Sequence, residues 1–157
     1  MRCLSLWQPW ATLVALRAKG WETRSWGTSY RGPLAIQASK TWNHTLADLC
    51  LTEPFYAHLS KVCEQRAYYR SGNALPLGAI VCVAELTACV RITADSAPTG
   101  DERAFGDYTP GRYMWQLTNV RPLRKPVPYR ASQGLFRIAS DDGVWGHLFA
   151  AMRGNAA

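Results

Sequence analysis

The sequence lacks any run near the roughly 20 apolar residues that a membrane-spanning helix needs. Its five cysteines form no CxxC pair and no Cys/His tract, which disfavours a structural zinc site. Glycine-rich phosphate loops of the GxGxxG or GxxxxGK type are absent, and so is the GxSxG turn of many serine hydrolases. We therefore expect no resident metal and no cofactor.

A secretory leader is also missing from the first residues. The opening stretch, MRCLSLWQPW, has neither the apolar core nor the cleavage site of such a leader. An odd number of cysteines without repeated spacing fits a reducing compartment. We expect a soluble, cytoplasmic protein with no membrane partner, and the sequence leaves its oligomeric state open.

Acidic residues are scarce. The sequence contains 11 Asp and Glu residues and 18 Lys and Arg residues, which gives a net charge of +7 and a pI of about 9.4. A length of 157 residues with 48% hydrophobic content predicts one domain, residues 1–157, with a sizeable core. The excess positive charge favours an acidic partner, nucleic acid before all others.

Short apolar segments alternate with helical patterns along the chain. CLSL, RGPLAIQAS and AIVCVAEL are typical of strands, whereas residues 45–70 have helical spacing with a break at Pro54. We expect a helix that starts near Pro9 to end at Gly20, and residues 121–134 to be irregular because of three prolines. This order predicts an α+β domain built on a strongly bent sheet or barrel.

Cations and aromatic rings gather in two parts of the sequence. Five basic residues lie between positions 17 and 40 against the single acid Glu22, and no acidic residue lies between 120 and 140. Phosphates that meet cations while bases stack on rings would produce such a pattern in a protein that binds single-stranded nucleic acid. A solvated basic face over an aromatic core would produce it equally well.

The stretch KGWETRSW places charged and hydroxyl side chains next to two tryptophans, Trp21 and Trp26. On an extended strand Glu22 and Arg24 point to one face and Thr23 to the other, while Lys19 lies at the end of the preceding helix. A partly desolvated Lys19 would have a lowered pKa and be available as a base or nucleophile. The alternative is a structural ion pair of Glu22 with Lys19 or Arg24.

Glu85 lies within the apolar strand VCVAELTACV, where a carboxylate needs a partner. It is either a second acid or base group at a pocket or the buried counter-charge of an arginine. The residues alone leave both readings open.

Four segments, SLWQPWATLV, KGWETRSW, YRGPLAIQASK and FGDYTPGRYMWQLTNVRPL, together resemble the ASCH domain, a branch of the PUA-like superfamily. The resemblance runs from Leu4 to about Leu135. It implies a small PUA-like β-barrel flanked by helices, with a helical insertion around residues 45–70. It also implies a cleft lined by the Lys19, Glu22 and Arg24 segment.

ASCH proteins are associated with RNA, and the resemblance implies two classes of function. The first is an RNA-binding module. The second is a hydrolase, either a ribonuclease on single-stranded RNA or an amidohydrolase of N4-acetylcytidine that uses lysine, threonine and glutamate. Lys19 matches that lysine by position and Glu85 stands in for the glutamate. Glu22 occupies the threonine position and Thr23 follows it, so the threonine role is not carried over.

We therefore predict a protein that binds single-stranded RNA or a modified nucleotide in a basic, aromatic-lined cleft, with a hydrolase as the alternative. A divalent cation would accompany only the ribonuclease, and a protein-interaction domain for an acidic partner is a third reading. The predicted catalytic residues of the hydrolase are Lys19, Glu22 and Glu85. The predicted RNA-binding residues are Trp7, Lys19, Arg24, Trp26, Tyr30, Arg31, Ser39 and Lys40.

Overall fold

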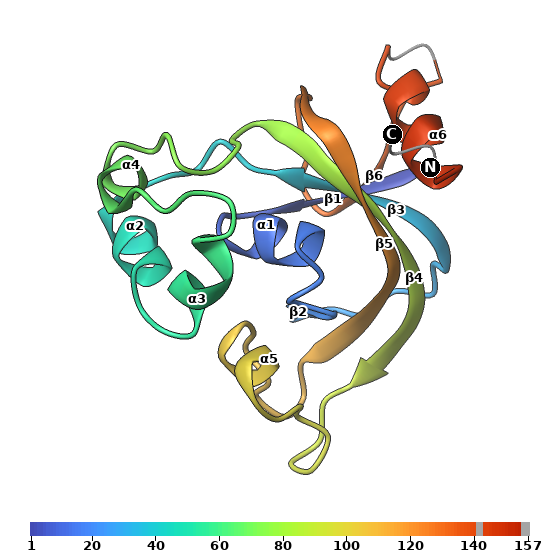
Figure 1. Cartoon of the computed structure of the whole chain (residues 1–157). Coiled ribbons are helices and arrows are strands. Elements are labelled where there is room, and N and C mark those ends of the chain that lie inside the picture. The colour runs from blue at the N-terminus through green and yellow to red at the C-terminus, as the bar shows by residue number, and fades with distance from the viewer. Residues whose placement is uncertain (141–142, 155–157) are drawn as a thin grey trace.

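The fold is a strongly curled sheet with helices around it, of the α+β class that the sequence predicts (Figure 1). The computed structural model describes residues 1–140 and 143–154. Six strands form one sheet in the order β2-β5-β4-β3-β1-β6. Their bounds are Arg2–Leu6 for β1, Trp21–Arg24 for β2, Gly32–Ala38 for β3, Ala79–Arg91 for β4, Tyr113–Pro128 for β5 and Leu135–Arg137 for β6.

The curl of the sheet has a local cause in its registers. The pairing of β4 with β5 shifts at three points, and that of β3 with β4 shifts between Ile36 and Gln37. Each such irregularity adds a bend and extra twist to the strand that carries it. The result is a half-barrel, because β2 and β6 lie at opposite edges of the strand order within the described part of the chain.

Helices cover the half-barrel on several sides. The bounds are Trp10–Ala15 for α1, His44–Cys50 for α2, Phe55–Leu59 for α3, Arg66–Arg70 for α4, Asp101–Ala104 for α5 and Trp145–Met152 for α6. Helix α1 lies within the curve of the sheet, α2 to α4 form a layer beside it, and α6 lies near the N-terminus (Figure 1). The main core fills the space between α1 and the sheet, with Leu4, Ile36, Leu86 and Trp115 fully buried.

Helix α1 ends earlier than the sequence predicts. Gly20 does not terminate it; the last helical residue is Ala15, and Arg17 adopts a left-handed conformation with φ of 60°. The N–H of Ala18 then bonds to the carbonyl of Leu13 at 2.9 Å, the six-to-one bond of a Schellman motif. Glycine normally occupies the left-handed position, so an arginine there carries backbone strain.

The prediction of an irregular segment after residue 120 is wrong for its first half. Strand β5 continues to Pro128 and stays paired with β4. Strand β2 pairs with β5 only as far as Gln116, so the later part of β5 is an edge strand within the described residues. Proline is tolerated on an edge strand because no neighbour there needs its missing N–H. The prolines concerned are Pro122, Pro126 and Pro128.

Candidate functional site

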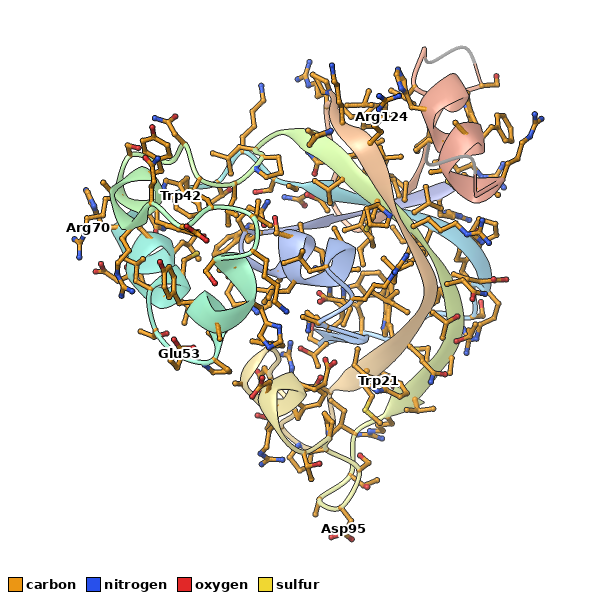
Figure 2. All side chains as sticks on the ribbon, in the orientation of Figure 1. Trp21, Trp42, Glu53, Arg70, Asp95 and Arg124 are labelled. Atoms are coloured by element: carbon orange, nitrogen blue, oxygen red, sulfur yellow. The ribbon has the colours of Figure 1, made fainter. Side chains whose placement is uncertain are left out.

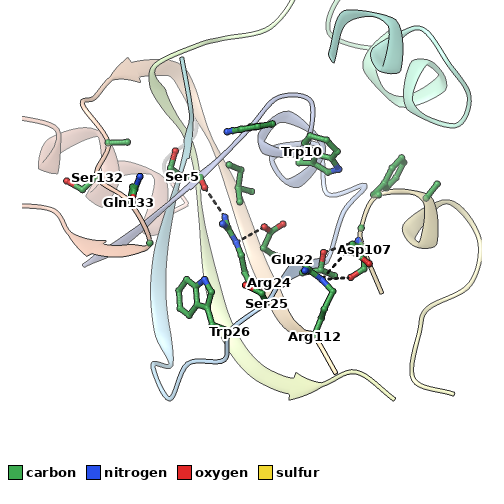
Figure 3. Close-up of a pocket in the computed structure, with 18 residues that line it drawn as sticks. Ser5, Trp10, Glu22, Arg24, Ser25, Trp26, Asp107, Arg112, Ser132 and Gln133 are labelled. Carbon is green, nitrogen blue, oxygen red and sulfur yellow. Dashed lines mark hydrogen bonds and ion pairs between the residues drawn. The ribbon is translucent and has the colours of Figure 1, made fainter. Parts of the chain in front are cut away.

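A large open cavity lies at the mouth of the half-barrel, and we call it the indole pocket. Its volume is about 910 Å³. Its walls are formed by strand β2, the end of β1 with the residues after it, the segment that follows α5 and the loop before β6 (Figure 3). Its lining includes Ser5, Trp7, Trp10, Glu22, Arg24, Trp26, Asp107, Arg112 and residues 131–134.

Glu22 and Arg24 form an ion pair on the pocket side of β2. Arg24 Nε lies 3.0 Å from Glu22 Oε1, and the Glu22 side chain is only 10% exposed. Arg24 also donates from Nη2 to the carbonyl of Ser5 at 2.9 Å, which ties β2 to the end of β1 (Figure 3). Both side chains therefore have fixed positions at the pocket wall.

A second ion pair closes another side of the pocket. Arg112 Nε lies 3.2 Å from Asp107 Oδ2. Hydrogen bonds from the hydroxyl and N–H of Thr109 lower the pKa of the Asp107 carboxyl, and Arg112 adds to this effect. With one carboxylate for each arginine, the described residues that line the pocket carry no net formal charge.

Lys19 is enclosed behind Glu22 rather than exposed in the pocket. Its side chain is 1% exposed and does not belong to the pocket lining. The Nζ atom donates to the carbonyls of Trp21 and Phe105, at 2.5 and 2.7 Å, and lies 3.7 Å from Glu22 Oε2. Burial lowers the pKa of Lys19, and the nearby carboxylates of Glu22 and Glu102 act in the opposite direction.

This shift predicts a pH-dependent stability. Between the lowered pKa of folded Lys19 and its ordinary value of 10.5, the unfolded chain holds a proton that the folded chain has released. Stability therefore rises with pH in that window, by about 1.4 kcal/mol per pH unit. Chemical denaturation at several alkaline pH values gives the free energy of unfolding of the wild type and of Lys19→Met. The difference between the two proteins isolates the contribution of Lys19, because tyrosines and cysteines titrate in both. If the two free energies changed with pH in parallel, this prediction would be contradicted.

Glu102 on α5 holds the start of β2 in place. Its two carboxylate oxygens accept the N–H groups of Gly20 and Trp21 at 2.7 and 3.2 Å, and one also accepts the Tyr108 hydroxyl at 3.1 Å. Burial of the phenol raises the pKa of Tyr108, and the contact with Glu102 raises it further. Helix α5 thus positions the Lys19 to Arg24 segment from outside.

Two exposed indoles border the indole pocket. Trp7 is 53% exposed and Trp26 is 37% exposed. Trp26 packs edge-on against the buried Trp115, with ring centroids 4.7 Å apart and an interplanar angle of 83°. Trp115 in turn donates from Nε1 to the Trp26 carbonyl at 3.3 Å. The core therefore fixes Trp26 from behind and leaves part of its ring available to a ligand.

A second cavity of about 870 Å³ lies next to the indole pocket, and we call it the lysine cavity. The predicted residues Ser39 and Lys40 line it, together with Arg130, and no acidic residue does so within the described chain. The two cavities share Ala131 as a lining residue. Lys40 and Arg130 are exposed and have no ion-pair or hydrogen-bond partner among the described residues.

Gln37 joins the two cavities through hydrogen bonds. Its side chain is 1% exposed and accepts the Ser5 hydroxyl at 2.7 Å, while its amide donates to the Tyr129 carbonyl at 3.2 Å. Ser5 lines the indole pocket, and Tyr129 and Gln37 line the lysine cavity. This buried link holds the walls of both cavities in one arrangement.

The remaining predicted residues lie apart from both cavities. The Tyr30 hydroxyl donates to the carbonyl of Pro33 at 2.6 Å, and Arg31 bonds to backbone carbonyls of its own loop. Glu85 is half-buried on β4, where Asn119 Nδ2 donates to its carboxylate at 3.1 Å. The partner of Glu85 is thus an amide rather than an arginine.

The described residues offer little for metal ligation. No three His, Cys, Asp or Glu side chains within residues 1–140 and 143–154 lie close enough together to hold a metal ion. The same residues contain no helix of the length and apolar character needed to cross a bilayer.

Sequence reasoning missed several residues of the site. Ser5, Trp10, Asp107, Arg112 and residues 131–134 line the indole pocket, yet they are separated by long stretches of sequence. The run RASQG between two strand-like segments is a weak signal for a loop, but nothing local indicates which cavity it borders. Only the pairing of β1 with β6 and of β2 with β5 brings these segments together.

Comparisons with known proteins agree with this architecture. A family model described as the ASCH domain matches residues 4–127. No curated protein matches the chain. The crystal structure of an ASCH protein from Zymomonas mobilis is similar with a TM-score of 0.53 and 16% sequence identity, and the match covers 89% of this chain and 88% of that one. The crystal structure of a mutant form of that protein is similar with a TM-score of 0.52 and 15% sequence identity, and the match covers 88% of this chain and 90% of that one.

Proposed function

Because the chain belongs to the ASCH domain family, we propose that it binds single-stranded RNA or a nucleotide. The base occupies the indole pocket and the adjoining phosphate lies in the lysine cavity. The observation that carries this proposal is that a charge-balanced aromatic pocket adjoins a cavity in which the charged lining residues, among those that the structure describes, are all cations.

The indole pocket suits an uncharged, planar, polar group. Its arginines are paired with carboxylates, so it offers no unbalanced charge to a phosphate. Its indoles offer faces for stacking, which contributes roughly 1–3 kcal/mol per base. The fixed Glu22 and Arg24 side chains present acceptors and donors of the kind that read the edge of an unpaired base.

The lysine cavity suits the phosphate of the same nucleotide or of its neighbour. Lys40 and Arg130 are cations without partners in the described chain, and Ser39 and Thr41 add hydroxyl groups. Since the cavity borders the indole pocket at Ala131, base and phosphate can be held at once. Cations that bind phosphates release counterions, which makes such binding weaken with salt.

Binding without turnover is the function that the geometry favours over hydrolysis. A lysine base or nucleophile must reach the substrate, whereas Lys19 is 1% exposed behind Glu22. Glu85 lies on β4 outside the pocket lining, so the three predicted catalytic residues do not meet at one point. RNA recovered intact after binding supports a binding module, and RNA fragments or a deacetylated nucleoside would support the hydrolase instead.

The proposal is tested by fluorescence anisotropy with labelled single-stranded RNA at several salt concentrations. We expect Lys40→Gln to weaken binding by about fivefold at low salt, because one solvent-exposed charge contact is lost. The slope of log affinity against log salt should fall by about 0.7–1.

Lys61→Gln is the matched control, because Lys61 is exposed and lies outside the residues that line the two cavities. It removes the same formal charge and should change neither the affinity nor the slope beyond a general charge effect. Equal losses in the two variants would indicate a diffuse basic surface in place of a phosphate contact. Affinity that does not change with salt would contradict the proposed function.

A further inference from the structure

A third cavity shares no lining residue with the other two, and we call it the arginine cavity. Its volume is about 500 Å³, and the turn after α1, strand β5 and the C-terminal end of α6 contribute to its walls. Two arginines line it, Arg17 and Arg121, and the described lining contains no carboxylate side chain. The other lining residues are Asn119, Val120, Pro122, Ala151 and Gly154.

Both arginines are held in position by the backbone around them. Arg17 donates from Nε to the carbonyl of Val120 at 3.0 Å, and Arg121 donates from Nη1 to the carbonyl of Met152 at 2.6 Å. The other guanidinium N–H groups have no partner among the described residues. Each cation is thus oriented by one bond and keeps donors for an anion, which lowers the entropic cost of binding one.

Backbone strain is concentrated at the same place. Arg17 and Asn119 are the two residues other than glycine with positive φ, at 60° and 47°, in the described chain, and both line the arginine cavity. Asparagine tolerates this conformation, but arginine in the left-handed position of a Schellman motif replaces the glycine that would relieve it. Strain of this kind persists only where the surrounding structure fixes the conformation, and it clusters at binding sites.

One segment connects all three cavities. Residues 121–134 begin in the arginine cavity, pass through the lysine cavity at 128–131 and reach the indole pocket at 131–134. The segment contains four basic residues and no acidic one. Figure 2 shows Arg124 at one end of β5, with Trp21 beside its other end. The basic residues are Arg121, Arg124, Lys125 and Arg130.

The character of the β5 edge argues for a polyanion as the partner of this segment. A protein strand that adds to a sheet edge needs a regular row of backbone donors, and the three prolines of β5 remove N–H groups from it. Exposed cations along the same stretch repel a basic partner and attract phosphates. The segment therefore matches a phosphate backbone better than a docking peptide.

We propose that the arginine cavity binds a phosphate group of an RNA strand whose base occupies the indole pocket. This proposal rests on the proposed function and extends it from one nucleotide to a strand. Arg121 pairs with Val83 and Pro128 pairs with Ala79, so the two residues lie opposite β4 positions only four residues apart, about 13 Å at roughly 3.3 Å per residue. That length corresponds to about four nucleotides, at the roughly 3.4 Å rise of a stacked strand, beyond the one whose phosphate lies in the lysine cavity.

A length series of oligouridylates tests the proposal. Full-length protein is titrated with chains of two, four, eight and twelve nucleotides, and we expect affinity to rise steeply between four and eight. Arg121→Gln and Arg17→Gln should each weaken binding of the eight-nucleotide chain about tenfold, because a charge-assisted hydrogen bond to phosphate is lost. Binding of the two-nucleotide chain should stay unchanged. Arg91→Gln, an exposed arginine outside the three cavities, is the charge-matched control.

Arg17→Gly separates function from folding. It removes the guanidinium as Arg17→Gln does, but it also relieves the left-handed backbone. Both variants should lose the same affinity for the eight-nucleotide chain, while the glycine variant unfolds at a higher temperature than the glutamine variant. Equal affinity of both variants and the wild type for long chains would overturn the proposal.

Inorganic phosphate provides the second arm of the experiment. If phosphate alone protects the wild type but not Arg121→Gln against thermal unfolding, and affinity is independent of RNA length, the cavity binds free phosphate and the strand is ruled out. If short chains bind normally without any gain from length or any response to phosphate, this inference fails and the proposed function stands. If no RNA of any length binds, the proposed function itself fails.

Discussion

Replacing Glu22 by glutamine is expected to lower the free energy of unfolding by about 3–5 kcal/mol. The carboxylate lies between two cations, with Lys19 Nζ at 3.7 Å and Arg24 Nε at 3.0 Å, and its side chain is 10% exposed. The amide keeps the shape but removes the charge, so the enclosed Lys19 ammonium loses its nearest counter-charge. Urea denaturation at neutral pH measures the loss.

Two further variants define where this loss comes from. Lys19→Met replaces the buried cation with an apolar chain and leaves the Glu22 and Arg24 pair intact, so it should be less harmful than Glu22→Gln. The double variant should be more stable than Glu22→Gln alone, because the uncompensated charge is gone. Glu85→Gln is the control, since an amide partners that carboxylate, and a change within about 0.5 kcal/mol is expected. Additive losses in the double variant would contradict a buried charge network.

Replacing Trp7 by alanine is expected to weaken RNA binding by about 5- to 150-fold, the equivalent of roughly 1–3 kcal/mol for one stacked base. Trp7 lines the indole pocket and is 53% exposed, so little core packing depends on it. The fold should therefore survive while a stacking surface disappears. Anisotropy titrations with two-nucleotide RNA measure the effect at the pocket itself.

Phe149→Ala is the matched control for Trp7→Ala. Phe149 is 46% exposed and belongs to α6, outside the lining of the indole pocket. It should leave RNA affinity unchanged at a similar small cost in stability. If Trp7→Ala binds as tightly as the control while both remain folded, the base does not stack on Trp7 and the assignment of the pocket is wrong.

The sequence predicted the family and the α+β class with a curled sheet, and both are confirmed. It did so because strand patterns and the KGWETR motif are local properties. It placed the end of α1 at Gly20 because glycine is the usual residue there, whereas the chain puts Arg17 in the left-handed position. The three prolines predicted an irregular segment, because whether a strand lies at the edge of a sheet, where proline is tolerated, depends on the whole sheet and not on the local sequence.

The candidate site was harder to predict because it depends on contacts between residues that are far apart in the sequence. Alternation along β2 correctly placed Glu22 beside Arg24, because two residues of one strand share a face. The enclosure of Lys19 depends on the Phe105 carbonyl, 86 residues later, and no local pattern encodes that contact. The roles proposed for Ser39 and Lys40 remain predictions, although both line one cavity.

The strand order of the sheet has a consequence for when the indole pocket forms during folding. Strand β1 lies between β3 and β6, and β6 is formed by residues 135–137. The indole pocket takes its walls from residues near 5, near 22 and from 131–134, so it is incomplete until residues 131–134 have joined the fold. Contacts between such distant segments form late, after the loop-closure entropy has been overcome. The indole pocket therefore takes its final shape only after β6 has paired with β1 at the edge of the sheet.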